Sequence, residues 1–182
     1  RAPLHTLPSR TKSGGPLQLL RRVSAYGRME ANSSYYEQGG YYMAIKIDLR
    51  VPPCTPVSGV ANFVSRCEEA GFDGVGILDS QLLERDVFVS MAMAAQATWR
   101  IRIASAVLNP VTRHVSVIAS AIKTVSEIAP GRAEFWIGRG FSSVHTIGVP
   151  PATVNQMRQC VLTLKSLLLG ENVSFKGATS RM

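Results

Sequence analysis

The stretch IRIASAVLNPVTRHVSVIASAIKTVSEIAPGRAEFWIGRGFSSVHTIG, residues 101–148, decides the fold of this chain. Residues 101–107 form an apolar run that is typical of a buried strand, and residues 132–138 form a second one. Between them, residues 114–129 carry apolar side chains at the i, i+3, i+4, i+7 spacing, which predicts a helix. The stretch therefore predicts a strand, a helix and a strand, with loops leaving the carboxyl ends of both strands. In α/β barrels that end of the sheet carries the functional groups.

The same alternation continues on both sides of this stretch. Further elements are predicted at residues 44–49 and 72–78 (strands) and at 57–70, 87–97 and 152–169 (helices), with Asp86 as an N-cap. Four strand-helix units joined by right-handed crossovers build either an open sheet or part of an eight-stranded barrel. The first strand is followed by RVPPCTPVSG, which lacks the glycine pattern of open dinucleotide-binding sheets, so a barrel is favoured. Because a complete barrel needs ~250 residues, we expect an α/β chain truncated to about its first four β-α units.

The first 42 residues differ in composition from the rest. Residues 1–42 contain six Lys/Arg against two Asp/Glu, and they are rich in Pro, Ser and Gly without a sustained period. We predict a poorly ordered extension there, with an interaction arm as the alternative. Met43 then opens MAIKIDL, so the partial barrel domain is predicted for residues 43–182.

Composition argues against several classes of protein. The formal net charge is +8, but half of it lies in residues 1–42 and no basic face is interleaved with aromatics, which argues against nucleic-acid binding. No run approaches the ~18 apolar residues of a membrane span, and the N-terminus has no signal layout. Cys54, Cys67 and Cys160 form no CxxC pair, which argues against a metal site and favours the cytoplasm.

Three motifs together resemble one protein family. GFDGVGILDS (71–80), RIRIASAVLNPVTRHVSVIASAIKTVSEIAPGR (100–132) and FWIGRGFSSVHTIGVPP (135–151) occur in the order and spacing of the luciferase-like flavin oxidoreductase superfamily. They are most similar to its deazaflavin branch, which includes methylenetetrahydromethanopterin reductases. The resemblance implies an eight-stranded barrel with coenzyme F420 or FMN at its C-terminal mouth. It also implies hydride transfer between the ring and a small organic substrate, or a monooxygenase where FMN is used with oxygen.

The resemblance also assigns roles to residues at the ends of three predicted strands. Asp79 matches a position that contacts the ring, and with the loop residue His145 it is a candidate for catalysis. The cofactor-binding positions that the resemblance implies are Asp79, Ser105, Ala106, Val107, Asn109, Gly138, Arg139 and Gly140. Within this set, residues 105–107 match a bulge that often contains a non-proline cis peptide.

Structural interpretations stay open beside these roles. Asp79 alternatively caps a loop, Arg139 alternatively pairs with a neighbouring carboxylate, and His114 is expected to cap or pack. Two positions depart from the family pattern, because Gly76 stands where many relatives carry a bulky aromatic and Ser80 stands where many carry His.

Two alternatives also stay open for the whole chain. It is alternatively an inactive or cofactor-free relative of the barrel family, or another phosphate-handling barrel. Half of a barrel leaves two open sheet edges, so we expect the chain to form a homo-oligomer. Trp136, in the middle of the last predicted strand, is expected to pack inside the barrel.

Overall fold

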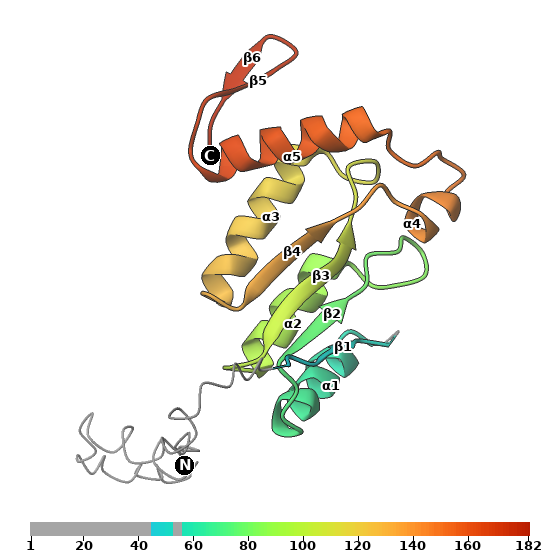
Figure 1. Cartoon of the computed structure of the whole chain (residues 1–182), viewed down its shortest axis with the longest axis vertical. Helices are drawn as coiled ribbons and strands as arrows, with labels where there is room; N and C mark the ends of the chain where they lie inside the picture. Colours follow the sequence, from blue (N-terminus) through green and yellow to red (C-terminus); the bar gives the residue numbers. More distant parts are fainter. Residues whose placement is uncertain (1–44, 53–55) are drawn as a thin grey trace, which may run out of the picture. The chain divides into compact units, whose positions relative to one another are not determined.

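Four parallel strands form one sheet in the order β1-β2-β3-β4 (Figure 1). The computed structural model describes residues 45–52 and 56–182, so the predicted extension over residues 1–42 and Cys54 lie outside this part. The strands are β1 (Asp48–Arg50), β2 (Gly74–Ile77), β3 (Arg102–Leu108) and β4 (Ala133–Ile137). The parallel sheet confirms the predicted α/β class.

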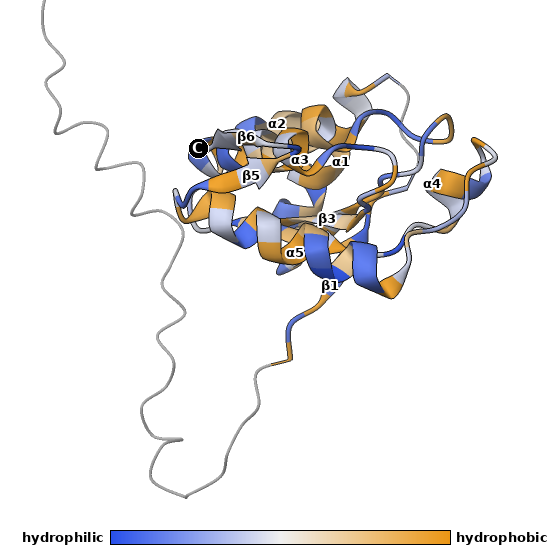
Figure 2. Cartoon of the chain, turned by 90° about the horizontal axis from the view of Figure 1, so that it is seen from above, coloured by the Kyte–Doolittle hydropathy of each residue, from blue (hydrophilic) through white to orange (hydrophobic). Residues whose placement is uncertain are grey.

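A helix follows each of these strands, as the periodicity predicts. The helices are α1 (Ser58–Glu69), α2 (Val87–Ala97), α3 (Val115–Ile128) and α5 (Val154–Leu168). Figures 1 and 2 show α1, α2 and α3 together on one face of the sheet. In the described part of the chain, no helix is both long and apolar enough to cross a membrane.

Three elements were missed by the sequence prediction. The loop expected after β4 contains the single-turn helix α4 (Ser142–His145), which is too short to show a periodic pattern. After α5, strands β5 (Val173–Phe175) and β6 (Ala178–Ser180) form an antiparallel hairpin separate from the main sheet. Its two-residue turn, Lys176-Gly177, has positive φ at both positions, as a type I′ turn requires.

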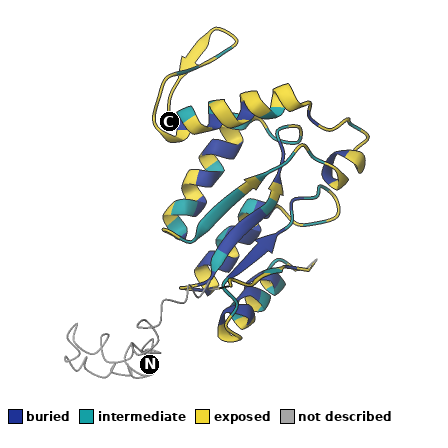
Figure 3. Cartoon of the chain, viewed as in Figure 1, coloured by how far each residue is buried: buried dark blue, intermediate teal, exposed yellow. Residues whose placement is uncertain are grey.

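The hydrophobic core lies between the sheet and the helices. Alternate strand residues such as Val75, Ile77 and Ile103 are buried and pack with Met91 of α2 and Ile118 of α3. Figure 3 shows this burial along β2 and β3. Each such side chain contributes roughly 1.5–3 kcal/mol by leaving water, so burial between the sheet and its helices stabilises the fold.

The opposite face of the sheet bears no helix within residues 45–52 and 56–182, and it carries a charged row. Arg102 of β3 donates hydrogen bonds to Asp48 of β1 (2.7 Å) and to Glu134 of β4 (2.6 Å). The hydrogen bond with Glu134 is the largest factor that raises the pKa of Arg102 above its ordinary value. Gly74 of β2 lies against this row, since a Cβ there would meet the Asp48 carboxylate at 2.7–2.9 Å.

A buried carboxylate joins α1 to the start of β3. Glu68 accepts hydrogen bonds from the backbone N–H groups of Trp99 (3.2 Å), Arg100 (2.6 Å) and Ile101 (2.7 Å). The Arg100 guanidinium in turn donates to the Glu68 carbonyl oxygen (2.6 Å). These bonds satisfy backbone donors that would otherwise be buried without partners.

Candidate functional site

The loops that follow β2, β3 and β4 meet at the carboxyl end of the sheet. The hydroxyl groups of Ser80, after β2, and Ser142, after β4, lie 2.8 Å apart in a hydrogen bond. Asn109, after β3, donates from Nδ2 to Oγ of Ser143 (3.1 Å). The structure therefore brings together the three loops that the sequence marked as functional.

Asp79 follows β2 and is the first member of a row of alternating charges, Asp79, Arg113 and Asp86, which we call the ladder. Its carboxylate is buried and accepts hydrogen bonds from Arg113 Nη1 (2.5 Å) and from Gln81 Nε2 (3.0 Å). The second terminal nitrogen of Arg113 donates to Asp86 (2.8 Å), which is also the N-cap of α2. Asp79 is thus held on both oxygens by residues of two loops.

The ion pair between Arg113 and Asp86 favours the charged form of both side chains. Burial acts to raise the pKa of Asp86, but hydrogen bonds from Arg113 and from the N–H groups of Val89 and Phe88 outweigh it and hold that pKa below its ordinary value. Burial acts to lower the pKa of Arg113, but Asp79 and Asp86 outweigh it and raise that pKa. The guanidinium also lies 5.4 Å from the centre of the Phe88 ring, within cation–π range.

The end of β3 contains the irregular segment that the family resemblance implies. The Ala106–Val107 peptide is cis, and the pairing of β3 with β4 shifts between Ser105 and Leu108. Across this irregularity the buried Ser105 hydroxyl accepts a hydrogen bond from Trp136 N (3.1 Å) and donates to Trp136 O (3.3 Å). Val107 stays 40% exposed, so its side chain is available at the surface of the site.

Glycines after β4 allow close approach between the loops. A Cβ on Gly138 would lie 2.9 Å from Val107 Cγ2, and one on Gly140, whose φ is +86°, would lie 2.8 Å from Val144 Cγ1. Asn109 is almost fully buried and accepts two backbone N–H bonds of its own loop (3.1 and 2.9 Å). Gly138 and Gly140 therefore let the loops approach closely, and Asn109 holds the backbone of the loop after β3.

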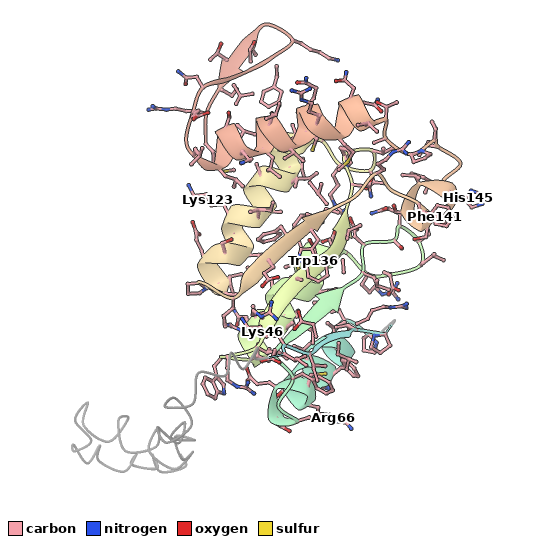
Figure 4. The ribbon with its side chains drawn as sticks, viewed as in Figure 1. Lys46, Arg66, Lys123, Trp136, Phe141 and His145 are labelled. Atoms are coloured by element: carbon pink, nitrogen blue, oxygen red, sulfur yellow. The ribbon has the colours of Figure 1, made fainter. Side chains whose placement is uncertain are left out.

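Arg139 and His145 lie at the outer part of the same region. The Nε of Arg139 donates to the carbonyl of Ala152, and the Ala152 N–H donates back to the Arg139 carbonyl (2.9 Å). Among the described residues Arg139 forms no ion pair, so the alternative of a carboxylate partner finds no support there. His145 and Phe141 are exposed beside α4 (Figure 4). No hydrogen bond within the described part joins His145 to Asp79, so the two predicted catalytic residues are not a bonded pair.

Sequence reasoning missed three polar residues of the site. Arg113 and Gln81 bind Asp79, as described above, and Thr112 precedes Arg113 in the loop after β3. Gln81 Oε1 and Thr112 Oγ1 are buried without a hydrogen-bond partner in the described structure. Asp79 follows β2 and Arg113 lies in the loop after β3, and no signal in the local sequence pairs the two.

The remaining candidates have structural roles. His114 is the N-cap of α3, as expected, and its ring lies 5.2 Å from that of Phe175 beside a groove between α3 and α5. Burial raises the pKa of the Cys67 and Cys160 thiols, which keeps both protonated at neutral pH. Within the described ranges no three His, Cys, Asp or Glu side chains gather into a metal site.

Comparison with known proteins gives concordant results. The luciferase-like monooxygenase family profile matches residues 34–182. A 5,10-methylenetetrahydromethanopterin reductase from Methanolobus tindarius is 31% identical over 129 residues, which are 69% of this chain and 39% of that protein.

Two solved structures share the fold. The coenzyme F420 dependent tetrahydromethanopterin reductase from Methanopyrus kandleri superimposes with a TM-score of 0.66 at 20% identity, over 76% of this chain and 45% of that one. The oxygenating constituent of 3,6-diketocamphane monooxygenase from Pseudomonas putida, in complex with FMN, gives 0.62 at 19% identity, over 75% and 44%. This chain therefore spans less than half the length of these relatives. The predicted luciferase-like barrel fold is confirmed, and the chain belongs to the luciferase-like monooxygenase family.

Proposed function

We propose that this chain forms the part of an F420- or FMN-dependent oxidoreductase that holds one side of the cofactor ring. The observation that carries the proposal is the convergence of the three loops after β2, β3 and β4, joined by the Ser80–Ser142 and Asn109–Ser143 hydrogen bonds. The family relatives include a protein described as F420 dependent and one solved with FMN. The reaction class is hydride transfer between the ring and a small organic substrate.

The side chains at these loops fit a flat, polar-edged ring with an anionic tail. Val107 is 40% exposed and offers apolar surface to the ring face. The glycines at 138 and 140 leave room for backbone contact, and the exposed Arg139 offers a cation to the tail. The two buried, unpartnered oxygens of Gln81 and Thr112 offer hydrogen bonds to the ring edge. These features support the proposed cofactor class.

Asp79 and His145 each have a defined role in this proposal. When bound, the cofactor supplies the hydride chemistry itself. Asp79 places hydrogen-bond acceptors beside the ring, and Arg113 and Gln81 hold its carboxylate in one orientation. His145 is exposed on α4, and in this proposal its imidazole is the candidate for proton transfer to or from the substrate. The alternative is a cofactor-free relative, which is favoured by the open sheet face that exposes Trp136.

Binding of the two cofactors to the 182-residue chain tests the proposal. Fluorescence titration with F420 and with FMN should show saturable binding of at least one of them, while circular dichroism confirms that the chain is folded. A folded chain that binds neither cofactor would contradict the proposal. The small-molecule substrate, the homo-oligomeric state and the cytoplasmic location belong to this proposal as well.

The role of Arg139 gives a sharper version of this test. Arg139→Gln should weaken binding of FMN about tenfold, because a guanidinium–phosphate contact is charge-assisted, and should leave riboflavin, which lacks the phosphate, unchanged. Arg158→Gln, on the exposed side of α5, is the matched control and should bind both ligands as the parent chain does. Equal loss of riboflavin and FMN would show that Arg139 supports the loop and not the phosphate.

A further inference from the structure

The Gln81 side chain is fixed in one orientation by its neighbour. Its Nε2 group donates to Asp79 Oδ1 (3.0 Å), and the other Asp79 oxygen is paired with Arg113 (2.5 Å). An ionised carboxylate only accepts hydrogen bonds, so turning the amide over would place two acceptor oxygens against each other. The ion pair with Arg113 therefore determines which end of the Gln81 amide faces Asp79 and which end is left over.

The ladder that imposes this orientation is anchored at both ends. Arg113 reaches Asp86 with its other terminal nitrogen (2.8 Å), and Asp86 accepts the N–H groups of Phe88 (2.9 Å) and Val89 (3.1 Å) at the start of α2. Asp79 itself lies two residues after β2 and is 5% exposed. The position of Gln81 is thus set by contacts that lead back to the loop after β2 and to the first turn of α2.

The oxygen of the Gln81 amide, Oε1, is a hydrogen-bond acceptor without a donor in the described structure. Gln81 Oε1 is buried and has no hydrogen-bond partner, and the same is true of Thr112 Oγ1 in the adjoining loop. Buried polar atoms are nearly always paired, and an unpaired one costs stability until a donor reaches it. An amide oxygen requires an N–H or O–H donor, whereas a threonine hydroxyl can donate as well as accept.

We propose that Gln81 is a ligand-binding residue whose Oε1 accepts a hydrogen bond from the ring N–H of the cofactor. This inference rests on the proposed function. Oxidised isoalloxazine and deazaflavin rings each carry one such N–H, at N3, with a carbonyl on either side. Gln81 Oε1 can accept a hydrogen bond from the N3–H group, and the Thr112 hydroxyl can donate one to a carbonyl beside N3. Asp79 and Arg113 then act as positioning residues for Gln81.

The ligand itself provides the first test. The chain is titrated with whichever of FMN and F420 it binds, and with the N3-methyl derivative of the same cofactor, which cannot donate. The parent chain should bind the N3-methyl derivative about tenfold more weakly, the effect of one hydrogen bond to a buried acceptor. Equal affinity for the two ligands would overturn the inference.

Two variants separate a lost hydrogen bond from a steric effect of the methyl group. Gln81→Ala removes Oε1 and leaves more space, so it should bind FMN or F420 about tenfold more weakly and should no longer discriminate against the methylated ligand. Gln96→Ala, on the exposed surface of α2, is the control and should behave as the parent chain. Discrimination that persists in Gln81→Ala would assign the N3 contact to another residue. A folded parent chain that binds neither cofactor would overturn the proposed function, and this inference with it.

Discussion

Among single residues, Ser105 makes the contribution that is least apparent from its chemistry. Its hydroxyl occupies the place where the β3–β4 pairing is irregular, and it bonds both the N–H and the carbonyl of Trp136. One small side chain thereby replaces a backbone partner that the irregular segment cannot provide. The resemblance marks Ser105 as a cofactor contact, but its oxygen is fully buried and already engaged with the neighbouring strand.

Replacing Ser105 should therefore affect the stability of the fold. Ser105→Ala removes the hydroxyl partner of two part-buried backbone groups of Trp136, so we expect the free energy of unfolding to fall by about 1–3 kcal/mol. Urea denaturation followed by circular dichroism measures this change. Ser120→Ala, on the exposed surface of α3, is the matched control and should stay within about 0.5 kcal/mol of the parent. Equal midpoints for the two variants would contradict the assigned role.

Sequence reasoning located the residues of the site better than their partners. The family resemblance implied roles for Asp79, Asn109 and Gly140, and the limits of the apolar runs placed these residues after predicted strands. Arg113 could not be matched with Asp79, since 34 residues separate them and nothing in the local sequence encodes the contact. Which side chains of two loops meet depends on how the sheet aligns the neighbouring strands. That alignment cannot be read from the sequence before the fold is known.

At the scale of elements, the start of α2 combines a helix cap with an ion pair. Asp86 caps the first turn with one oxygen and binds Arg113 with the other, so a single carboxylate connects α2 to the loop after β3. The N-cap could be predicted, because Asp is among the preferred residues directly before an apolar helix. The short helix α4 and the hairpin β5–β6 could not, since three or four residues carry too little periodicity.

Because Asp86 is both the N-cap of α2 and the partner of Arg113, its contribution to the stability of the fold depends on pH. The pKa of Asp86 in the folded chain lies below the ordinary value of 3.8, so its contribution to stability is fully present above that value and is lost as the pH falls through the folded-state pKa. Asp86→Ser keeps a capping oxygen but removes the carboxylate. It should be less stable than the parent by about 0.2–1 kcal/mol at neutral pH, because the pair is partly exposed.

Urea midpoints measured across the acid range check this prediction. The difference between the parent chain and Asp86→Ser should narrow below about pH 4 and vanish once Asp86 is protonated in both the folded and the unfolded states. Asp48→Ser, which removes a different partly exposed carboxylate that is also paired with an arginine, is the comparison for general charge effects. A difference that stays constant from neutral to strongly acid pH would contradict the role given to Asp86.

At the scale of the whole molecule, one face of the sheet is covered by helices and the other is open in the described residues. Among the strands of residues 45–52 and 56–182, β1 and β4 each pair with one neighbour only, so within these ranges both lie at edges of the sheet. Trp136 was expected to pack inside a barrel, and in the structure its side chain is 44% exposed on β4. An exposed aromatic beside an open edge favours association with another polypeptide.

The proposed homo-oligomer should therefore depend on Trp136. Trp136→Lys should weaken self-association about tenfold, because a lysine would have to lose its hydration when the open face is covered. Trp99→Lys changes the other tryptophan, which is 74% exposed after α2, and should leave association unchanged. Sedimentation equilibrium over a range of concentrations measures both. Monomeric behaviour of the parent chain, or equal effects of the two substitutions, would contradict this arrangement.

The charged row on the open face also has an evolutionary consequence. The Asp48 carboxylate occupies the space where a side chain at position 74 would begin, so a substitution at 74 must displace this carboxylate from its pair with Arg102. Shortening or removing the acid at 48 frees that space, and Arg102 then keeps Glu134 as its remaining partner. An alignment of related sequences should accordingly show positions 48 and 74 changing together, with the acid and the glycine gained and lost as a pair.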